Sequence, residues 1–496
     1  MLRTMAEQAF SRTAGAPLVG GNAVRVLRDA TENYPVWEAA IARARHTVHV
    51  EMYIFHRDAV GRRYVDLLTR KARDGVTVRV LYDWFGTGVG PALGLFSPLM
   101  AAGGTVRPFN PPSLTAALGW VRRDHRKLIT VDAEVAFIGG LCIGQAWEGR
   151  PDLGQEPWRD TAVEIMGPAV EEAEQAFAES WRLASDNPCE SLPMAPSGAP
   201  AGSVNLRLIP TDPFTANLLR LDLLVTTLAR RSLWISDAYF IGTGPYLEAL
   251  RRAAADGVDV RLLLPQDSDV AWTVSISRSL YRPLLEAGVR IFEWSGTMMH
   301  AKTAVADGRW ARIGSTNLNL TSWIGNWELD VAIEDEGVAR TLESHFETDL
   351  ERCTEIVLGT YRGRARLRAR REAGAARAAP RRVRSSRRVV RTVTGVGRSV
   401  SAAITGNRPV EDFELAPLIA VGAMLVGVAL LGLLAPRALA WPIAILAGWT
   451  ATTMVVEAWA LWRKSRQTRA PDRERRDPEP STRHPEPEPR TEHPEP

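Results

Sequence analysis

The sequence predicts an α/β protein made of two pseudo-symmetric α/β half-domains that form one site, followed by a C-terminal transmembrane helical hairpin. Three observations lead to this prediction. A short motif occurs twice in the 496-residue chain, a longer pattern of helices and strands surrounds each copy, and two long apolar runs lie near the C-terminal end.

The longer pattern repeats in the same order in both parts of the chain. "AIARARHTVHVEMYIF" (40–55) precedes "KARDGVTVRVLYD" (71–83), just as "TLARRSLWISDAYFI" (227–241) precedes "AAADGVDVRLLLP" (253–265). Each pair reads as helix, apolar-alternating strand, helix, Asp-Gly turn and second strand. Helices that alternate with apolar strands indicate an α/β layer fold.

The repeat sets the predicted boundaries. The first half-domain is expected over 15–190 and the second over 205–355. They are joined by a linker over 191–204, in a stretch rich in Pro, Gly and Ser.

The segment after residue 355 has a different character. Residues 356–410 are arginine-dense and are predicted to be a juxtamembrane segment. The apolar runs within 413–462 are each long enough to span a bilayer, which takes about 20 residues, although a buried helix pair is the alternative. Their short connection makes a hairpin, and the basic residues on both flanks place its ends in the cytoplasm. The Pro- and charge-rich tail over 468–496 is predicted to be disordered.

Net charge, cysteine spacing and the N-terminal sequence limit the classes of function that the chain can have. The net charge is only +4, and the three cysteines are scattered without metal-ligand or disulfide spacing. This pattern suits a reducing compartment or the absence of a redox role. The first 21 residues lack an apolar core of signal-peptide length, so secretion is not expected.

The repeated motif is a histidine, a lysine two residues later, an aspartate and a glycine-containing turn. Its members are His125, Lys127, Asp132 and Gly140 in the first copy, and His300, Lys302, Asp307 and Ser315 in the second. Alternate residues of a strand share a face, so each histidine is expected to project beside its lysine. Only four of the 61 basic residues are lysines, and two of these are in the motif. A compact ammonium is therefore indicated there, which arginine would replace poorly.

These residue types suit phosphodiester transfer. A neutral imidazole can act as a nucleophile or base near neutral pH. A lysine can neutralise a phosphate oxygen. Two halves that face each other would place one histidine to attack phosphorus and the other to protonate the leaving alcohol, with no metal or cofactor required. Ordinary strand residues are the alternative, but two copies at equal spacing favour a site.

With these motifs the chain resembles the phospholipase D superfamily, whose signature is H-x-K-x4-D followed by G-G/S-x-N. It is most similar to the cardiolipin synthase branch, through "YIFHRDAVGRRYVDLL" (53–68), "WRDTAVEIMGPAV" (158–170) and "SWIGNWELDVAI" (322–333). The resemblance covers 15–355. It implies two phospholipase D-like halves, one shared site and a phosphohistidine intermediate.

The resemblance also implies individual roles. His125 would be the nucleophile and His300 the acid and base. Phosphate oxygens would be bound by Lys127, Lys302 and Asn317, close to the turns at Gly140 and Ser315, while Asp160 and Glu328 would orient the histidines. Asp132 and Asp307 either act with the histidines or buttress the strand and turn.

Two features depart from the family pattern. Cys142 stands where the first half usually has Asn, and a thiol is a weaker hydrogen-bond donor than an amide. Cys142 is either a catalytic thiol or a buried small apolar residue. The predicted hairpin is C-terminal, whereas in the usual bacterial cardiolipin synthases it is N-terminal.

The resemblance implies a membrane-anchored phosphatidyltransferase that moves a phosphatidyl group between phosphatidylglycerol molecules and releases glycerol. The expected partners are anionic phospholipids and the cell (inner) membrane, with the catalytic domain and both termini cytoplasmic and no nucleic acid bound. The alternatives are a phospholipase D-type hydrolase, a nuclease whose arginine-rich segment binds phosphates, and a membrane scaffold with a decayed site.

Overall fold

The computed structural model describes residues 2–358, except 89, 92, 112–121, 186–191, 193–197 and 214. The predicted juxtamembrane segment, hairpin and tail over 356–410, 413–462 and 468–496 lie outside this part of the chain, apart from 356–358. Within it, no helix is both long and apolar enough to cross a bilayer.

The two halves form one 15-stranded sheet, in which seven strands of the first half and seven of the second lie in the same spatial order, and the second half adds an eighth, β15. The first-half strands run β1-β7-β6-β5-β2-β3-β4 from the centre outwards, and those of the second half run β8-β14-β13-β12-β9-β10-β11, with β15 at the edge. The first-half strands are β1 (Val19–Arg28), β2 (Thr47–Met52), β3 (Thr77–Asp83), β4 (Thr105–Phe109), β5 (Lys127–Val131), β6 (Val135–Gly139) and β7 (Thr161–Met166). The second-half strands are β8 (Val204–Thr211), β9 (Ser232–Ser236), β10 (Asp259–Pro265), β11 (Arg290–Trp294), β12 (Thr303–Ala306), β13 (Trp310–Gly314), β14 (Glu328–Glu334) and β15 (Cys353–Ile356).

The two halves join where β1 meets β8. These strands pair antiparallel, with Val19 opposite Leu206 and Asn22 opposite Val204. The buried Asn22 amide donates to the carbonyls of Val19 and Val204, which secures the irregular register at the junction. The predicted linker therefore ends where the second half begins its sheet.

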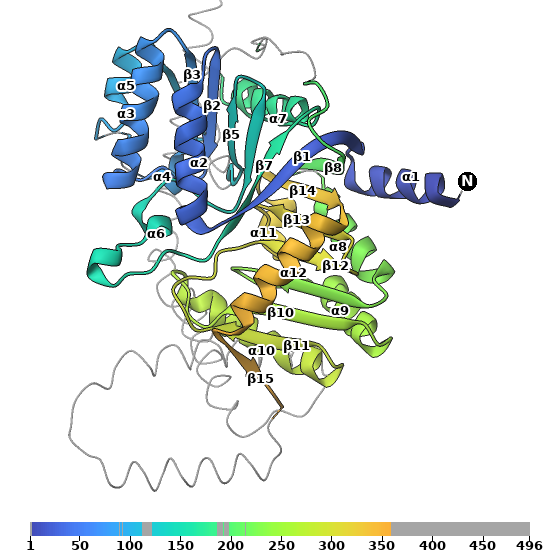
Figure 1. Ribbon diagram of the computed structural model, residues 1–496. Coiled ribbons are helices and arrows are strands. Elements are labelled where there is room, and N and C mark those ends of the chain that lie inside the picture. The colour runs from blue at the N-terminus through green and yellow to red at the C-terminus, as the bar shows by residue number, and fades with distance from the viewer. Residues whose placement is uncertain are drawn as a thin grey trace, which may run out of the picture. The chain divides into compact units, whose positions relative to one another are not determined.

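Helices cover the sheet in the order that the repeat predicts (Figure 1). The first half has α2 (Asp29–Arg43), α3 (Ala59–Arg73), α4 (Trp84–Thr87), α5 (Ser97–Ala101), α6 (Gln145–Glu148), the 3₁₀ turn Pro151–Leu153 and α7 (Val170–Leu183). The second has α8 (Asn217–Leu228), α9 (Gly244–Ala255), α10 (Ala271–Glu286), α11 (Leu320–Ile324) and α12 (Glu336–Leu350). The helix–strand–helix–strand pattern expected from the two repeated segments is confirmed in both halves.

The N-terminal helix crosses the predicted boundary between the halves. Helix α1 (Leu2–Ala14) precedes the first half in sequence, yet its Phe10 and Ala14 belong to the apolar cluster of the second half, beside α8. Both halves also share a central core under α7 and α12, which contains Phe177, Trp181 and Phe346. This shared core fixes the two halves against each other and thereby sets the geometry between the two motifs.

Candidate active site

The two motif histidines lie in extended segments that leave their own half to pair with the other half. The amide of His125 donates to the carbonyl of Trp327 at 2.8 Å, and the amide of His300 donates to the carbonyl of Arg159 at 2.7 Å. Regular strand begins only at Lys127 and at Thr303. The prediction that the histidines lie on the strands themselves is corrected. Their backbone amides donate hydrogen bonds across the interface between the two halves instead.

Each histidine is held by a carboxylate from the opposite half. His125 Nδ1 lies 2.8 Å from Glu328 Oε2, and His300 Nδ1 lies 2.6 Å from Asp160 Oδ2. Both carboxylates are fully buried and the histidines nearly so. A carboxylate only accepts, so each Nδ1 carries the proton and each Nε2 keeps its lone pair.

The two carboxylates are supported differently. Ser315 Oγ donates to Glu328 Oε2 at 2.6 Å, and Asn326 Nδ2 donates to Oε1 at 3.3 Å. On the other side Trp147 Nε1 donates to Asp160 Oδ2 at 3.1 Å, and a side chain at Gly140 would collide with that carboxylate. The shorter Asp thus faces a glycine and the longer Glu a serine, at equivalent places in the two turns.

Two lysines complete the centre. Lys127 and Lys302 are buried, and each Nζ donates to the carbonyl of its own motif histidine. Lys127 Nζ lies 5.0 Å from the centre of the Tyr53 ring, and Lys302 Nζ lies 5.7 Å from that of Tyr239. Carbonyl and aromatic face together hold each ammonium in position.

Burial sets the protonation of these groups. Burial lowers the pKa of His125 to about 4, against the opposing effect of Glu328, and burial together with Lys302 lowers the pKa of His300 to about 4. Burial also lowers the pKa of Lys302 to about 8. Near neutral pH both imidazoles are therefore neutral, and a bound anion would raise their pKa values.

Each of the two lysines lowers the pKa of both histidines. Lys302 contributes to the lowered pKa of His125, and Lys127 to that of His300. The two motifs therefore share one electrostatic environment, as expected for a single site.

Asn317 is buried with its Oδ1 unpartnered. A buried acceptor without a partner is costly, which is consistent with an amide that faces a ligand, and the Nδ2 donor of the same amide is the group that could bind a phosphate oxygen.

The motif aspartates lie at the opposite end of the strands. Asp132 accepts the backbone N–H groups of Arg45, His46 and Thr47 at 2.7–2.8 Å. Asp307 accepts those of Arg230, Arg231 and Ser232. Neither contacts His125 or His300 in the described structure, so these contacts favour the buttressing role over a role with the motif histidines. They tie a turn to the neighbouring strand.

Cys142 lies in the apolar cluster of the first half and is fully buried. Burial raises the pKa of its thiol, which leaves little thiolate near neutral pH. These observations favour the small apolar residue over the catalytic thiol.

Trp147, Asn326 and Tyr53 were not among the predicted site residues. Trp147 follows the first glycine turn in a short helix, and nothing in its sequence pattern marks it as a partner of Asp160. Its role arises only because α6 places the Trp147 indole against Asp160 and His300. The residues that the structure describes contain no group of three or more His, Cys, Asp or Glu side chains placed to hold a metal ion.

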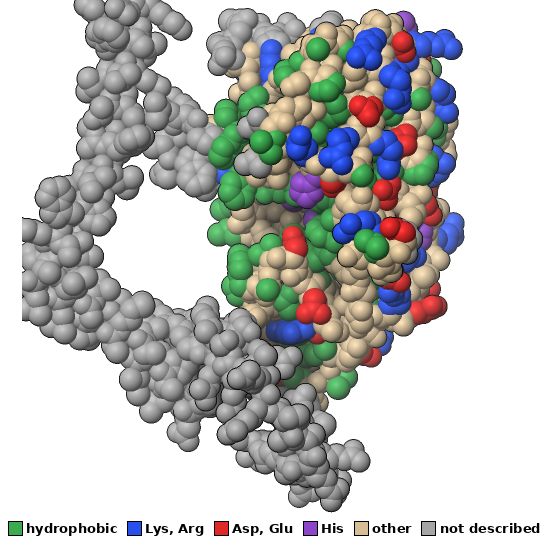
Figure 2. Space-filling view, turned by 90° about the vertical axis from the view of Figure 1, so that its left-hand side faces the viewer, with side chains coloured by type: hydrophobic (Ala, Val, Ile, Leu, Met, Phe, Trp, Pro, Cys, Tyr) green, Lys and Arg blue, Asp and Glu red, His purple; other side chains and the backbone are tan. Residues whose placement is uncertain are grey.

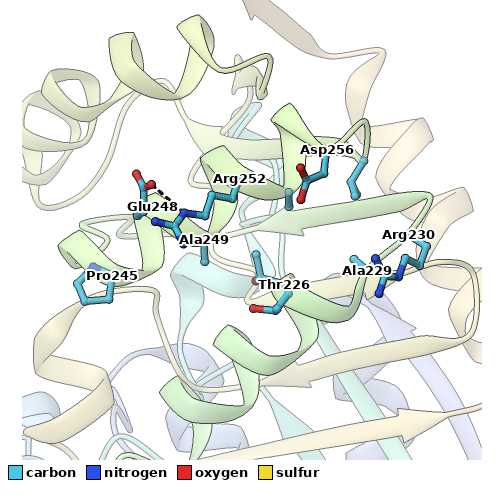
Figure 3. A pocket seen from close by; sticks show the side chains of 11 residues that line it. Thr226, Ala229, Arg230, Pro245, Glu248, Ala249, Arg252 and Asp256 are labelled. Carbon is cyan, nitrogen blue, oxygen red and sulfur yellow. Dashed lines mark hydrogen bonds and ion pairs between the residues drawn. The ribbon is translucent and has the colours of Figure 1, made fainter.

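A pocket of about 420 Å³ lies between α8 and α9 (Figure 3). It is lined by Arg230, Glu248, Arg252 and Asp256 among others, and Arg252 donates to Glu248 at 2.9 Å. No motif residue lines it, so it is distinct from the candidate active site.

Proteins of similar sequence include cardiolipin synthases. The family model described as "Cardiolipin synthase, PLD-like domain" matches residues 225–350. A cardiolipin synthase of Clostridium perfringens is 30% identical over 355 residues, which are 69% of this chain and 74% of that protein. One from Halalkalibacterium halodurans is 32% identical over 368 residues, 71% of each chain.

A solved structure shares the fold. The phosphatidylserine synthase of Haemophilus influenzae superposes with a TM-score of 0.51 at 13% identity, covering 70% of this chain and 91% of that one.

Proposed function

Because the chain belongs to the cardiolipin synthase branch of the phospholipase D superfamily, we propose that it transfers a phosphatidyl group from one phosphatidylglycerol to another and releases glycerol. The observation that carries this proposal is the crossed pair of histidine–carboxylate contacts around two buried lysines.

In the first step, His125 Nε2 attacks phosphorus and forms an N–P bond. The P–O bond to the glycerol headgroup breaks, and His300 gives a proton to the leaving oxygen. Glu328 stabilises the positive charge that develops on His125. Burial raises the pKa of Glu328, but His125, Lys127 and the Ser315 hydroxyl outweigh that effect, so its pKa stays below the usual value and it remains a carboxylate.

In the second step, a hydroxyl of another phosphatidylglycerol attacks the same phosphorus. His300 takes the hydroxyl proton, and the N–P bond breaks to give cardiolipin. Lys127, Lys302 and Asn317 would bind the phosphate oxygens in both steps. The anionic phosphodiester favours protonated imidazole, which supplies the acid that the free site lacks near neutral pH.

We further propose that the chain is held at the cytoplasmic face of the cell membrane by the hairpin predicted over 413–462. The arginine-dense segment before it would add about 1 kcal/mol of attraction per basic residue near an anionic surface.

The test is to incubate the detergent-solubilised full chain with phosphatidylglycerol and to identify the lipid products. Cardiolipin and free glycerol are expected. Both should be lost in His125→Ala and His300→Ala but retained in His46→Ala, which alters an exposed histidine. Phosphatidic acid in place of cardiolipin would make the chain a hydrolase. Turnover of nucleic acid, or of nothing, would overturn the proposal.

The order of the two histidines has its own readout. A stable phosphohistidine is expected to accumulate on His125 when the second step is blocked, for example in His300→Ala given a substrate with an activated leaving group. The assignment would be reversed if the His125→Ala protein accumulated the label on His300 while the His300→Ala protein carried none on His125.

A further inference from the structure

Exposed apolar side chains occur in the segments that follow β3, β10 and β13. They are Trp84, Phe85, Trp272, Ile276, Leu320 and Ile324, here called the apolar rim, and each is between 37% and 59% exposed. Hydrophobic side chains also line the left-hand edge of the described domain in Figure 2, above and below a hollow.

The first-half part of the rim is linked through Asp83 to the segment that carries His125. Asp83 ends β3, and its carboxylate accepts the amide of Phe85 at 3.0 Å and that of Asp124 at 3.0 Å. The Arg123 guanidinium lies 4.6 Å from the centre of the Phe85 ring. Trp84 and Phe85 therefore stand beside the segment that delivers His125.

The second-half part is tied in the same way to His300. The Tyr239 ring packs edge-on to His300 at 6.0 Å, and its hydroxyl donates to Asp269 at 2.8 Å, three residues before Trp272. The Asn319 amide donates to the Tyr239 carbonyl at 3.0 Å, and Leu320 follows at once. The segments after the equivalent strands β3 and β10, and a third segment after β13, thus bring exposed apolar groups close to the residues around His125 and His300.

We infer that the apolar rim docks the catalytic domain onto the interfacial region of the bilayer, independently of the predicted hairpin. This inference rests on the proposed function. The reacting phosphodiester must reach two nearly buried histidines while its acyl chains stay in an apolar medium. A second protein seated on the rim would cover the entrance, whereas the lipid surface supplies the substrate through it. Tryptophan and phenylalanine are suited to this interface.

The first test is independent of catalysis. The full chain is reconstituted in vesicles of phosphatidylglycerol and phosphatidylcholine, with an environment-sensitive dye attached at position 272 through Trp272→Cys. The matched control carries the dye at position 228 through Leu228→Cys, an exposed apolar site on α8 outside the rim, and the unsubstituted chain gives the labelling background. Bromines on the upper acyl chain should quench the dye at 272 about three-fold more than the dye at 228. Equal quenching would overturn the docking, whether or not the protein turns lipid over.

The second test separates docking from chemistry. The ratio of turnover on vesicle phosphatidylglycerol to turnover on a dispersed short-chain phosphatidylglycerol should fall about ten-fold in Phe85→Ser/Trp272→Ser. Leu228→Ser and Met166→Ser, both exposed outside the rim, should keep the ratio of the unsubstituted chain. An unchanged ratio in the rim variant, or equal loss on both substrates, would overturn the inference. No turnover by the unsubstituted chain would refute the proposed function and leave the quenching result to decide the docking.

Discussion

His125 of the first half lies 2.8 Å, from Nδ1 to Oε2, from Glu328 of the second half. The reciprocal contact joins His300 to Asp160 of the first half. Each motif imidazole therefore takes its tautomer and orientation from the other half. Neither motif can be set up correctly unless the two halves are docked.

Glu328→Gln should lower turnover on the order of 10³–10⁴-fold, because an amide no longer enforces the Nδ1–H tautomer or stabilises positive charge on His125. Turnover of phosphatidylglycerol by the detergent-solubilised protein measures this. The control is Glu156→Gln, which removes an exposed pair with Arg352 that also bridges the halves and should change little. Near-normal turnover in Glu328→Gln would refute the positioning role.

Activity should fall as the pH rises through about 8, because the buried Lys302 loses its proton there and with it the charge that binds the phosphate. The measurement is kcat/KM for phosphatidylglycerol against pH, which reports groups of the free enzyme. In Lys302→Arg the charge persists, so this alkaline limb should move upward by more than one pH unit even though the rate is lower. An unmoved limb would assign it to another group.

Asp132→Ala should destabilise the fold and leave the chemistry intact. The loss of three backbone hydrogen bonds to a carboxylate predicts a decrease of about 1–3 kcal/mol in the free energy of unfolding. Asp132→Asn keeps an acceptor and tolerates the φ of 53°, so it should lose less. Thermal unfolding, with turnover measured below the transition, checks both effects. A stable but inactive Asp132→Ala would restore the catalytic interpretation.

Cys142→Ala should cost about 1 kcal/mol of stability, since it removes one buried sulfur from a packed cluster, and should leave turnover within about three-fold. A thiol-alkylating reagent should inhibit the unsubstituted chain no more than Cys142→Ala, because the thiol is buried and protonated. Complete loss of turnover in Cys142→Ala, with the fold retained, would make the thiol functional.

The sequence by itself determined the two halves, their order of helices and strands, and the chemical identity of the centre. Periodicity and a duplicated motif are local properties of the chain, so they can be recognised in the sequence without knowledge of the fold. The scarcity of lysine drew attention to Lys127 and Lys302 in the same local way.

Only the tertiary structure decided which carboxylate serves which histidine. Asp160 and Glu328 each follow a motif in their own half, but β1 and β8 join the halves so that each carboxylate meets the histidine of the other. The same holds for Asp132 and Asp307, which share the motif's spacing yet lie at the far end of a strand from the histidines. Spacing along a chain fixes only which residues are neighbours in sequence. Contacts between the halves depend on how two packed cores dock, and this docking cannot be predicted from a local sequence pattern.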